Sequence, residues 1–198
     1  MNVRPSFDSN SSVNQTNYYW FDKVFSSEDL SNINNLQNLY SYQLGTVVGD
    51  DNDESILNPV RKSNIKWIPH DENSLWLYDR IQTMVLEANE IWQFQLNSII
   101  DSIQYTEYYD NGGHYGWHMD IGPHPINHRK ISITIQLSNP DEYEGGDLEL
   151  WAGIGQVLAP RSQGCAVLFP SFMHHRITPV TKGTRKSLVL WVGGGSYK

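Results

Sequence analysis

The chain has 198 residues, of which 39% are hydrophobic, and this composition suits one domain with a sizeable buried core. Its formal net charge is −8 at pH 7, and it contains no run of basic residues. Nucleic acid is therefore not an expected partner, because phosphate backbones are bound by clustered Lys and Arg. No apolar stretch approaches the roughly 20 residues that cross a bilayer, and no apolar signal core is found near the N-terminus. We expect a cytoplasmic protein with no membrane partner.

The predicted elements begin with a polar segment rich in Ser and Asn over 1–17, which we expect to be a flexible arm before a single domain at 18–198. A helix is predicted after residues 26–29, because they can form a capping box ahead of apolar residues at near-helical spacing. The acidic segment 45–53 is a candidate lid. An apolar stripe predicts a second helix over 73–92.

From residue 102 onward the apolar pattern changes to a period of two, which is typical of strands. The alternation of apolar and polar side chains is clearest over 131–137, and further short strands are predicted around Leu148 and Leu188. Helices followed by strands indicate an α+β fold. The single cysteine, Cys165, cannot form an internal disulfide and is expected to be a small core residue.

A candidate metal site is formed by His118, Asp120 and His175. Two neutral imidazoles and one carboxylate can occupy one face of a mononuclear Fe(II) ion and leave the opposite positions open. On an extended segment, residues two apart point the same way, so His118 and Asp120 can converge on one ion while Met119 faces away. We expect His175 to come from a strand that the fold brings alongside.

A candidate carboxylate clamp follows ten residues after His175. Arg185 and Ser187 lie two apart in a predicted strand, so both side chains should share one face of it. The guanidinium can bind a carboxylate in a bidentate pair, and the hydroxyl can add a hydrogen bond. A metal triad together with such a clamp indicates an acidic cosubstrate.

At this point the sequence resembles the iron- and 2-oxoglutarate-dependent dioxygenases, and within them the prolyl 4-hydroxylase-like group. The resemblance covers about residues 60–192 and rests on three segments in the family's order, 109–120, 144–148 and 169–180. In the last segment the register makes His175 the ligand rather than His174. The resemblance implies a double-stranded β-helix, a jelly-roll core with the N-terminal helices packed on one sheet.

The resemblance also implies an enzyme that uses Fe(II), 2-oxoglutarate and O2, with ascorbate as a candidate reductant. The triad would hold the iron, while Arg185, Ser187 and the hydroxyl of Tyr109 would bind the distal carboxylate of 2-oxoglutarate. Tyr109 stands nine residues before His118, where this group places a cosubstrate-binding tyrosine. Related halogenases replace the carboxylate ligand by a small residue, so Asp120 favours hydroxylation, with release of succinate and CO2.

The expected substrate residues are Arg61, Ser63, Trp67 and Trp191. The first three resemble residues that lie beside a peptide-closing loop in prolyl 4-hydroxylase-like enzymes, and Trp191 occupies a family position near the substrate. Together they favour a prolyl residue in a peptide or protein. The alternative is free proline, another amino acid or a small molecule, and Arg61 could equally be a solvated surface charge.

Two other classes of protein fit parts of this pattern. One is a binding module that keeps the fold without catalysis, and the intact triad and Arg185 argue against it. The other is a cupin-like metalloenzyme that needs no keto acid, from which Arg185 again distinguishes the chain. Succinate formation that depends on iron and 2-oxoglutarate would separate all three.

Overall fold

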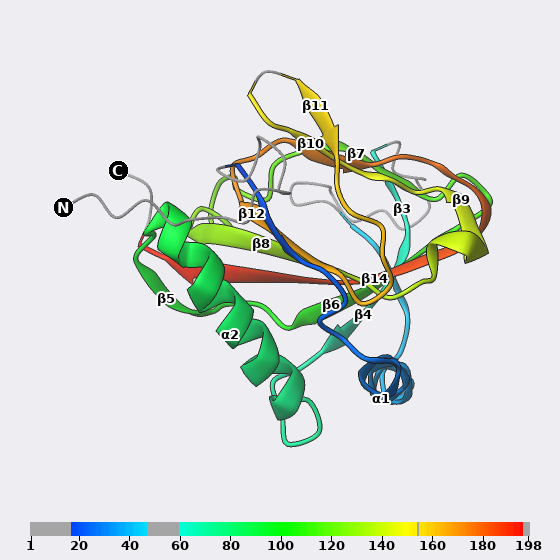
Figure 1. Ribbon diagram of the computed structural model, residues 1–198, viewed down its shortest axis with the longest axis horizontal. Helices are drawn as coiled ribbons and strands as arrows, with labels where there is room; N and C mark the ends of the chain where they lie inside the picture. The colour runs from blue at the N-terminus through cyan, green and yellow to red at the C-terminus, as the bar shows by residue number, and fades with distance from the viewer. Residues whose placement is uncertain (1–16, 47–59, 154, 196–198) are drawn as a thin grey trace.

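The computed structural model describes residues 17–46, 60–153 and 155–195 (Figure 1). The expected arm over 1–17 and the acidic segment 45–53 lie almost entirely outside these ranges. The described helices are α1 (Ser27–Gln37), α2 (Leu75–Trp92) and the short 3-10 helix η1 (Pro140–Glu142). Neither α1 nor α2 has the length and apolarity that a bilayer-spanning helix requires.

Both predicted helices are present, and local contacts explain where they begin. The Ser26 hydroxyl accepts a hydrogen bond from the Asp29 amide at 3.2 Å, and the Asp29 carboxylate accepts one from the Ser26 amide at 2.8 Å. This reciprocal capping box satisfies amides at the start of α1 that have no partner within the helix. In α2 the apolar stripe that predicted the helix is buried at Leu77, Ile81 and Ala88.

The strands form two antiparallel sheets, as Figure 1 shows. Along its main path the larger sheet has the order β1 (Tyr19–Phe21), β12 (Ala166–Pro170), β8 (Arg129–Gln136), β14 (Val180–Gly194), β6 (Ile103–Tyr109), β4 (Asn64–Ile68) and β2 (Gln43–Leu44). Two further strands, β5 (Leu96–Ile99) and β9 (Tyr143–Gly145), also pair with β14. The smaller sheet has the order β11 (Gln156–Leu158), β10 (Leu148–Trp151), β13 (His175–Ile177), β7 (His114–His118) and β3 (Arg61–Lys62).

The two faces of β8 show how the layers are arranged. Ile131, Ile133 and Ile135 are buried in a core cluster that also contains residues of both helices, so the helices pack on this face of the larger sheet. This confirms the expected placement of helices on one sheet. The alternating polar residues of β8 are also buried, because their face is covered by the smaller sheet rather than by solvent.

A second apolar cluster fills part of the space between the sheets, including Leu150, Val167, Phe169 and Ile177. Cys165 belongs to this cluster and is buried, as expected. The apolar cluster occupies only part of the space between the sheets, and the remainder is lined by the polar side chains described below. A separate cavity of about 460 Å³ lies on the helix side, between α1 and β14, and is lined by none of the residues of the candidate site.

Candidate active site

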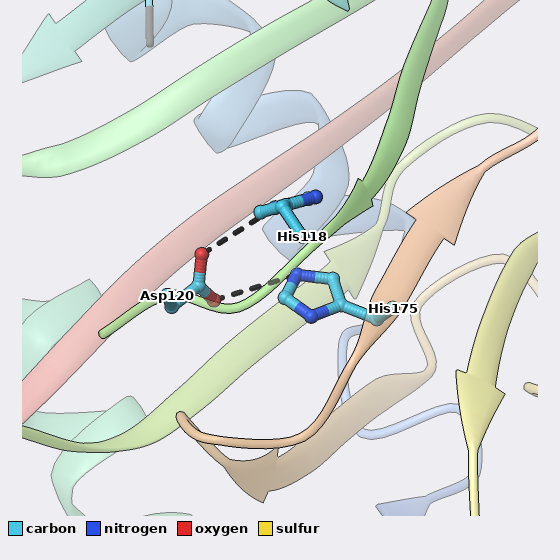
Figure 2. Close-up of side chains that lie close together, drawn as sticks. All are labelled: His118, Asp120 and His175. Carbon is cyan, nitrogen blue, oxygen red and sulfur yellow. Dashed lines mark ion pairs between the residues drawn. The ribbon is translucent and has the colours of Figure 1, made fainter. Parts of the chain in front are cut away.

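Strands β7 and β13 bring the three candidate metal ligands together. His175 is directly opposite His118 in the antiparallel ladder, and Asp120 follows two residues after β7 ends. The candidate ligand atoms of the three residues all lie within 4.8 Å of one another. Figure 2 shows the Asp120 carboxylate facing both rings. Asp120 Oδ1 lies 3.5 Å from His118 Nε2, and Asp120 Oδ2 lies 3.5 Å from His175 Nε2.

Backbone carbonyls fix the tautomer of both imidazoles. His118 Nδ1 lies 2.8 Å from the Gly116 carbonyl oxygen, and His175 Nδ1 lies 2.9 Å from that of Met173. Since a carbonyl oxygen only accepts, each Nδ1 must carry the hydrogen, which leaves the Nε2 lone pair free to bind a metal. Burial lowers the pKa of His175 to about 4, against an opposing effect of Asp120, so this ring is neutral at physiological pH.

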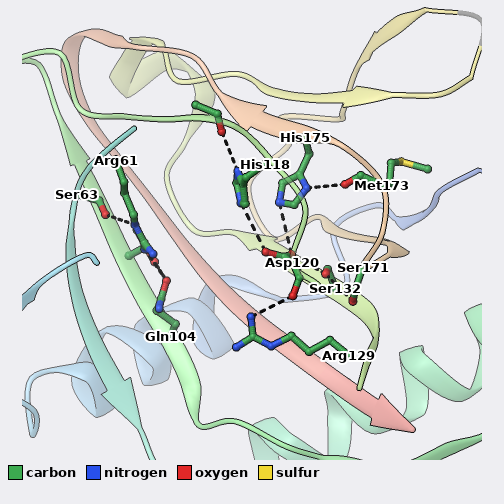
Figure 3. Close-up of polar contacts among 12 residues, drawn as sticks. Arg61, Ser63, Gln104, His118, Asp120, Arg129, Ser132, Ser171, Met173 and His175 are labelled. Atoms are coloured by element: carbon green, nitrogen blue, oxygen red, sulfur yellow. Dashed lines mark hydrogen bonds and ion pairs between the residues drawn. The ribbon is translucent and has the colours of Figure 1, made fainter. Parts of the chain in front are cut away.

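Asp120 is held by groups from two other segments (Figure 3). The Ser132 hydroxyl donates to Asp120 Oδ2 at 2.6 Å, and the Asp120 amide donates to the Ser171 carbonyl oxygen at 2.9 Å. Arg129 Nη1 donates to the Asp120 carbonyl oxygen at 3.4 Å. Burial opposes the negative charge, yet the two histidines and the Ser132 hydroxyl hold the pKa of Asp120 well below its usual range. The carboxylate is therefore ionised and fixed in direction.

The predicted clamp residues also come together. Arg185 is 2% exposed, and its Nη1 donates to the Ser187 hydroxyl at 3.2 Å. Among the described residues, no carboxylate forms an ion pair with this guanidinium. Burial lowers the pKa of Arg185, and the nearby Tyr108 and Tyr143 favour its charged form. A buried cation that lacks a counterion is costly, so this position calls for an anionic ligand.

The structure does not bring Tyr109 to this clamp. In the ladder between β6 and β14, Arg185 is opposite Tyr108, whereas Tyr109 is opposite Thr184. The Tyr109 hydroxyl donates to the Glu107 carboxylate on the helix side of the sheet. Tyr109 therefore does not share the face of the clamp, contrary to the expectation. Tyr108 shares the inner face with Arg185, whose Cζ lies 5.5 Å from the centre of the Tyr108 ring.

Of the four expected substrate residues, Arg61 lies in β3 at the edge of the smaller sheet and Ser63 follows it, whereas Trp67 and Trp191 lie in β4 and β14 of the larger sheet. Arg61 is buried, and its Nε donates to the Ser63 hydroxyl at 2.8 Å (Figure 3). Its Nη2 donates to Gln104 Oε1 at 2.7 Å. Trp67 is opposite Gln104 in the ladder between β4 and β6, and its ring lies 6.4 Å from that of Trp191. The alternative of a solvated Arg61 is wrong.

Tyr115 connects this group to the metal ligands. Its ring stacks on His118 with centroids 3.5 Å apart and planes inclined by 13°, and Arg61 Cζ lies 4.7 Å from its centre. Burial raises the pKa of the Tyr115 hydroxyl to about 12, so the group stays neutral at physiological pH. Arg61 thus adjoins the candidate metal site through the Tyr115 ring, and Trp191 adjoins it through Arg129, whose Cζ lies 3.9 Å from the centre of the Trp191 ring.

Comparison with known proteins identifies the family. The model of the 2OG-Fe(II) oxygenase superfamily matches residues 103–193, which include the triad and the clamp. A PKHD-type hydroxylase of Aliarcobacter butzleri is 30% identical over 177 residues, covering 86% of this chain and 75% of that protein. The chain belongs to the 2OG-Fe(II) oxygenase superfamily. Membership in this superfamily implies Fe(II) and 2-oxoglutarate, and the donor set fits them, with three ligand groups for iron and an unpaired buried cation for an anionic cosubstrate.

Other oxygenases of known sequence or structure are similar over different lengths. A PKHD-type hydroxylase of Teredinibacter turnerae is 42% identical over 89 residues, which is 42% of this chain and only 39% of that relative. A solved structure of a Trichoplax adhaerens prolyl hydroxylase, in complex with a peptide fragment of the hypoxia-inducible factor oxygen degradation domain, superimposes with a TM-score of 0.69. It is 16% identical, and the alignment covers 91% of this chain and 85% of that chain. This likeness confirms the double-stranded β-helix.

Sequence reasoning missed the residues that support this oxygenase site from neighbouring strands. Ser132 carried a usable signal, because it is polar in a strand whose other face is formed by isoleucines. Tyr115 and Ser171 gave no comparable signal, since an aromatic or a small hydroxyl residue in a strand or turn is common. Tyr115 contacts His118 within β7, whereas the contact of Ser171 with Asp120 joins segments far apart in the chain.

Proposed function

We propose that the protein is an Fe(II)- and 2-oxoglutarate-dependent hydroxylase that acts on prolyl residues of a peptide or protein and releases succinate and CO2. His118, Asp120 and His175 would hold the iron, and Arg185, Ser187 and Tyr108 would surround the distal carboxylate of 2-oxoglutarate. The relatives that carry the name PKHD-type hydroxylase support the class of reaction.

The observation that carries this proposal is the buried Arg185 guanidinium, which has no carboxylate partner among the described ion pairs. On β14 the Arg185 side chain lies on the inner face of the larger sheet, which it shares with Ser187 and Trp191. A cupin-like enzyme without a keto acid would have no use for this cation. The distal carboxylate of a dicarboxylic keto acid would supply the missing negative charge beside Arg185, and its keto-acid end would bind the metal.

The residues of the chain contribute binding, orientation and exclusion of water. When bound, iron and 2-oxoglutarate would supply the oxidising chemistry that side chains cannot perform. Gly116 and Met173 carbonyls would keep both Nε2 atoms directed at the metal. Ser132 would keep the Asp120 carboxylate ionised and in place. The low exposure of Arg185 would make its pairing with the cosubstrate strong and specific.

Two observations support a prolyl peptide as substrate. The Trichoplax adhaerens enzyme with the same fold is a prolyl hydroxylase in complex with a peptide fragment. In this chain Arg61 bonds Ser63 and lies over the Tyr115 ring beside the candidate iron ligands, and Trp67 is opposite Gln104, which also bonds Arg61. A peptide could reach the iron along this group.

A free amino acid is the second candidate, favoured by the partners of Arg61. Its hydrogen bonds within the described chain go to the neutral oxygens of Ser63, Gln104 and Thr46. A buried guanidinium with neutral partners could still pair with an α-carboxylate. Free proline would supply that group, whereas an internal prolyl residue would not.

One assay tests the reaction and separates the two substrates. Purified protein is incubated with Fe(II), 2-oxoglutarate, ascorbate and either proline-containing peptides or free amino acids. We expect succinate in amounts that match a peptide product carrying one added oxygen, detected by mass spectrometry. Product from free amino acids alone would favour the second candidate. No succinate with any of them, in protein that binds iron, would contradict the proposal.

A variant of Arg61 tests the substrate residues. Arg61→Gln should reduce hydroxylation while slow substrate-independent succinate formation persists, because its contacts are separate from Arg185. Arg80→Gln is the matched control, since Arg80 pairs with Asp29 on the helix side. Normal hydroxylation by Arg61→Gln would remove this group from the substrate route.

A further inference from the structure

The space beside Arg185 is closed by a tyrosine that the proposed function has not used. A small cavity of about 10 Å³, room for roughly one water molecule, is lined by Arg185, Thr134, Gln136 and Tyr143 among others. Tyr143 is 4% exposed and begins β9, which pairs with β14 so that Tyr143 is opposite Gly183. The pairing brings Tyr143 to the same end of β14 as the clamp.

The ring of Tyr143 is held by Arg161, which also lines this cavity. Arg161 Cζ lies 4.5 Å from the ring centre, and Arg161 Nη2 donates to the Tyr143 carbonyl oxygen at 3.3 Å. Arg161 is itself held by Asp147, which accepts from Nη1 at 2.6 Å. Tyr143 therefore has little freedom to turn away from the cavity.

The hydroxyl of Tyr143 has one hydrogen to give. Gln136 Nε2 donates to its oxygen at 2.6 Å, and its nearness favours the charged form of Arg185. In the described part of the chain, no hydrogen bond has the Tyr143 hydroxyl as donor. Gln136 and Arg185 thus both interact with the hydroxyl oxygen of Tyr143, and its O–H hydrogen is available for an acceptor in the cavity.

Gly146 allows this close approach of the β9 turn to the clamp. It has a φ of +63°, and a Cβ at this position would lie 3.0 Å from Arg185 Cδ and 3.3 Å from Tyr143 Cε2. A side chain at position 146 would push the turn away from Arg185. The glycine therefore allows Tyr143 and Arg185 to line the same cavity.

We propose that the Tyr143 hydroxyl is a donor to the distal carboxylate of the keto-acid cosubstrate and makes the site selective for a dicarboxylic acid. This inference rests on the proposed function. Arg185 supplies the charge, and Ser187 and Tyr143 supply hydroxyls from β14 and β9. A keto acid without a distal carboxylate would reach the metal but leave all three without their acceptor.

Binding calorimetry on the full chain tests this without turnover. Mn(II)-loaded protein is titrated with 2-oxoglutarate and, separately, with 2-oxobutyrate, which has the keto-acid end but no distal carboxylate. Tyr143→Phe should raise the Kd for 2-oxoglutarate by about tenfold to a hundredfold, since a hydrogen bond to a charged group is lost. Its Kd for 2-oxobutyrate should stay within about twofold of wild type, because that ligand does not use the hydroxyl.

Tyr109→Phe is the matched control, because it removes a hydroxyl from the neighbouring strand on the opposite face. It should bind both ligands like wild type. Tyr143→His retains a ring and an N–H donor, and its affinity for 2-oxoglutarate should lie between those of wild type and Tyr143→Phe. This variant replaces Tyr143→Phe if the latter does not fold.

The outcomes separate this inference from the proposed function. Unchanged 2-oxoglutarate affinity in Tyr143→Phe would overturn the role of Tyr143, and so would an equal loss for both ligands, which indicates a structural role. Failure of wild type to bind 2-oxoglutarate, or wild-type affinity in Arg185→Gln, would instead overturn the proposed cosubstrate.

Discussion

The Ser132 hydroxyl lies 2.6 Å from Asp120 Oδ2 and joins β8 of the larger sheet to the candidate iron ligand. The Ser171 hydroxyl is 3.0 Å from that of Ser132, and the Ser171 carbonyl oxygen accepts from the Asp120 amide. Asp120 lies outside β7, so these contacts, rather than a strand ladder, hold the carboxylate toward both histidines. The positions of the three candidate metal ligands therefore depend on β8 as well as on β7 and β13.

Ser132→Ala should weaken metal binding without removing a ligand. Loss of a hydrogen bond that orients a ligand typically costs about tenfold to a hundredfold in metal affinity. The measurement is a competition titration of Mn(II) or Fe(II) against a chelator. Ser138→Ala is the control, because that buried hydroxyl bonds the Thr184 carbonyl oxygen away from the triad. Equal affinities of Ser132→Ala and wild type would remove the serine from the site.

The two adjacent histidines should behave differently. His175 is buried against Asp120, whereas the His174 side chain is exposed. His175→Ala should lose tight binding of one metal ion per chain, and His174→Ala should keep it, as measured by metal analysis after dialysis. The reverse result would show that the ligand register is displaced by one residue.

Arg185→Ala should separate cosubstrate binding from metal binding. Removing one partner of a buried charge pair typically costs about 3–5 kcal/mol, because the other charge is stranded. The Kd for 2-oxoglutarate should therefore rise by about a hundredfold or more, while the metal affinity stays near wild type. Arg185→Lys keeps the charge and should recover part of the affinity. Unaltered 2-oxoglutarate affinity in Arg185→Ala would contradict the assignment.

Cys165 should be unreactive in the folded protein. Its side chain is fully buried, and burial raises the pKa of its thiol to about 12. At pH 8 the reactive thiolate is therefore scarce as well as inaccessible. A chromogenic disulfide reagent should label one thiol per chain only after denaturation. Rapid labelling of native protein would show that this part of the core opens readily.

The grouping of His118 with Asp120 and of Arg185 with Ser187 could be predicted from sequence, because each pair stands two residues apart in an extended segment. Such pairs share a face whatever the strand pairs with, so His118 with Asp120 and Arg185 with Ser187 needed no tertiary information. The α+β layout was equally accessible, since the helical and strand periods are local properties. The expected use of ascorbate, the cytoplasmic location and the domain boundary at 18 remain predictions from sequence.

Tyr109 shows where this reasoning stops. Choosing between Tyr108 and Tyr109 requires the register of β6 against β14, and a change of one residue reverses the face of every side chain. Tyr143 and Ser132 depend still more on the fold, because they reach the site through pairing between strands far apart in the chain. Residues of this kind could be found only with the sheet order known.

The most direct test of the central claim is a crystal structure of the protein with Mn(II) and 2-oxoglutarate, prepared without oxygen. We expect one metal ion on Nε2 of His118, Nε2 of His175 and a carboxylate oxygen of Asp120, chelated by the keto-acid end of the cosubstrate. The distal carboxylate should lie on the Arg185 guanidinium. A metal ion held by other residues, or a cosubstrate carboxylate that leaves Arg185 unpaired, would contradict this account of the site.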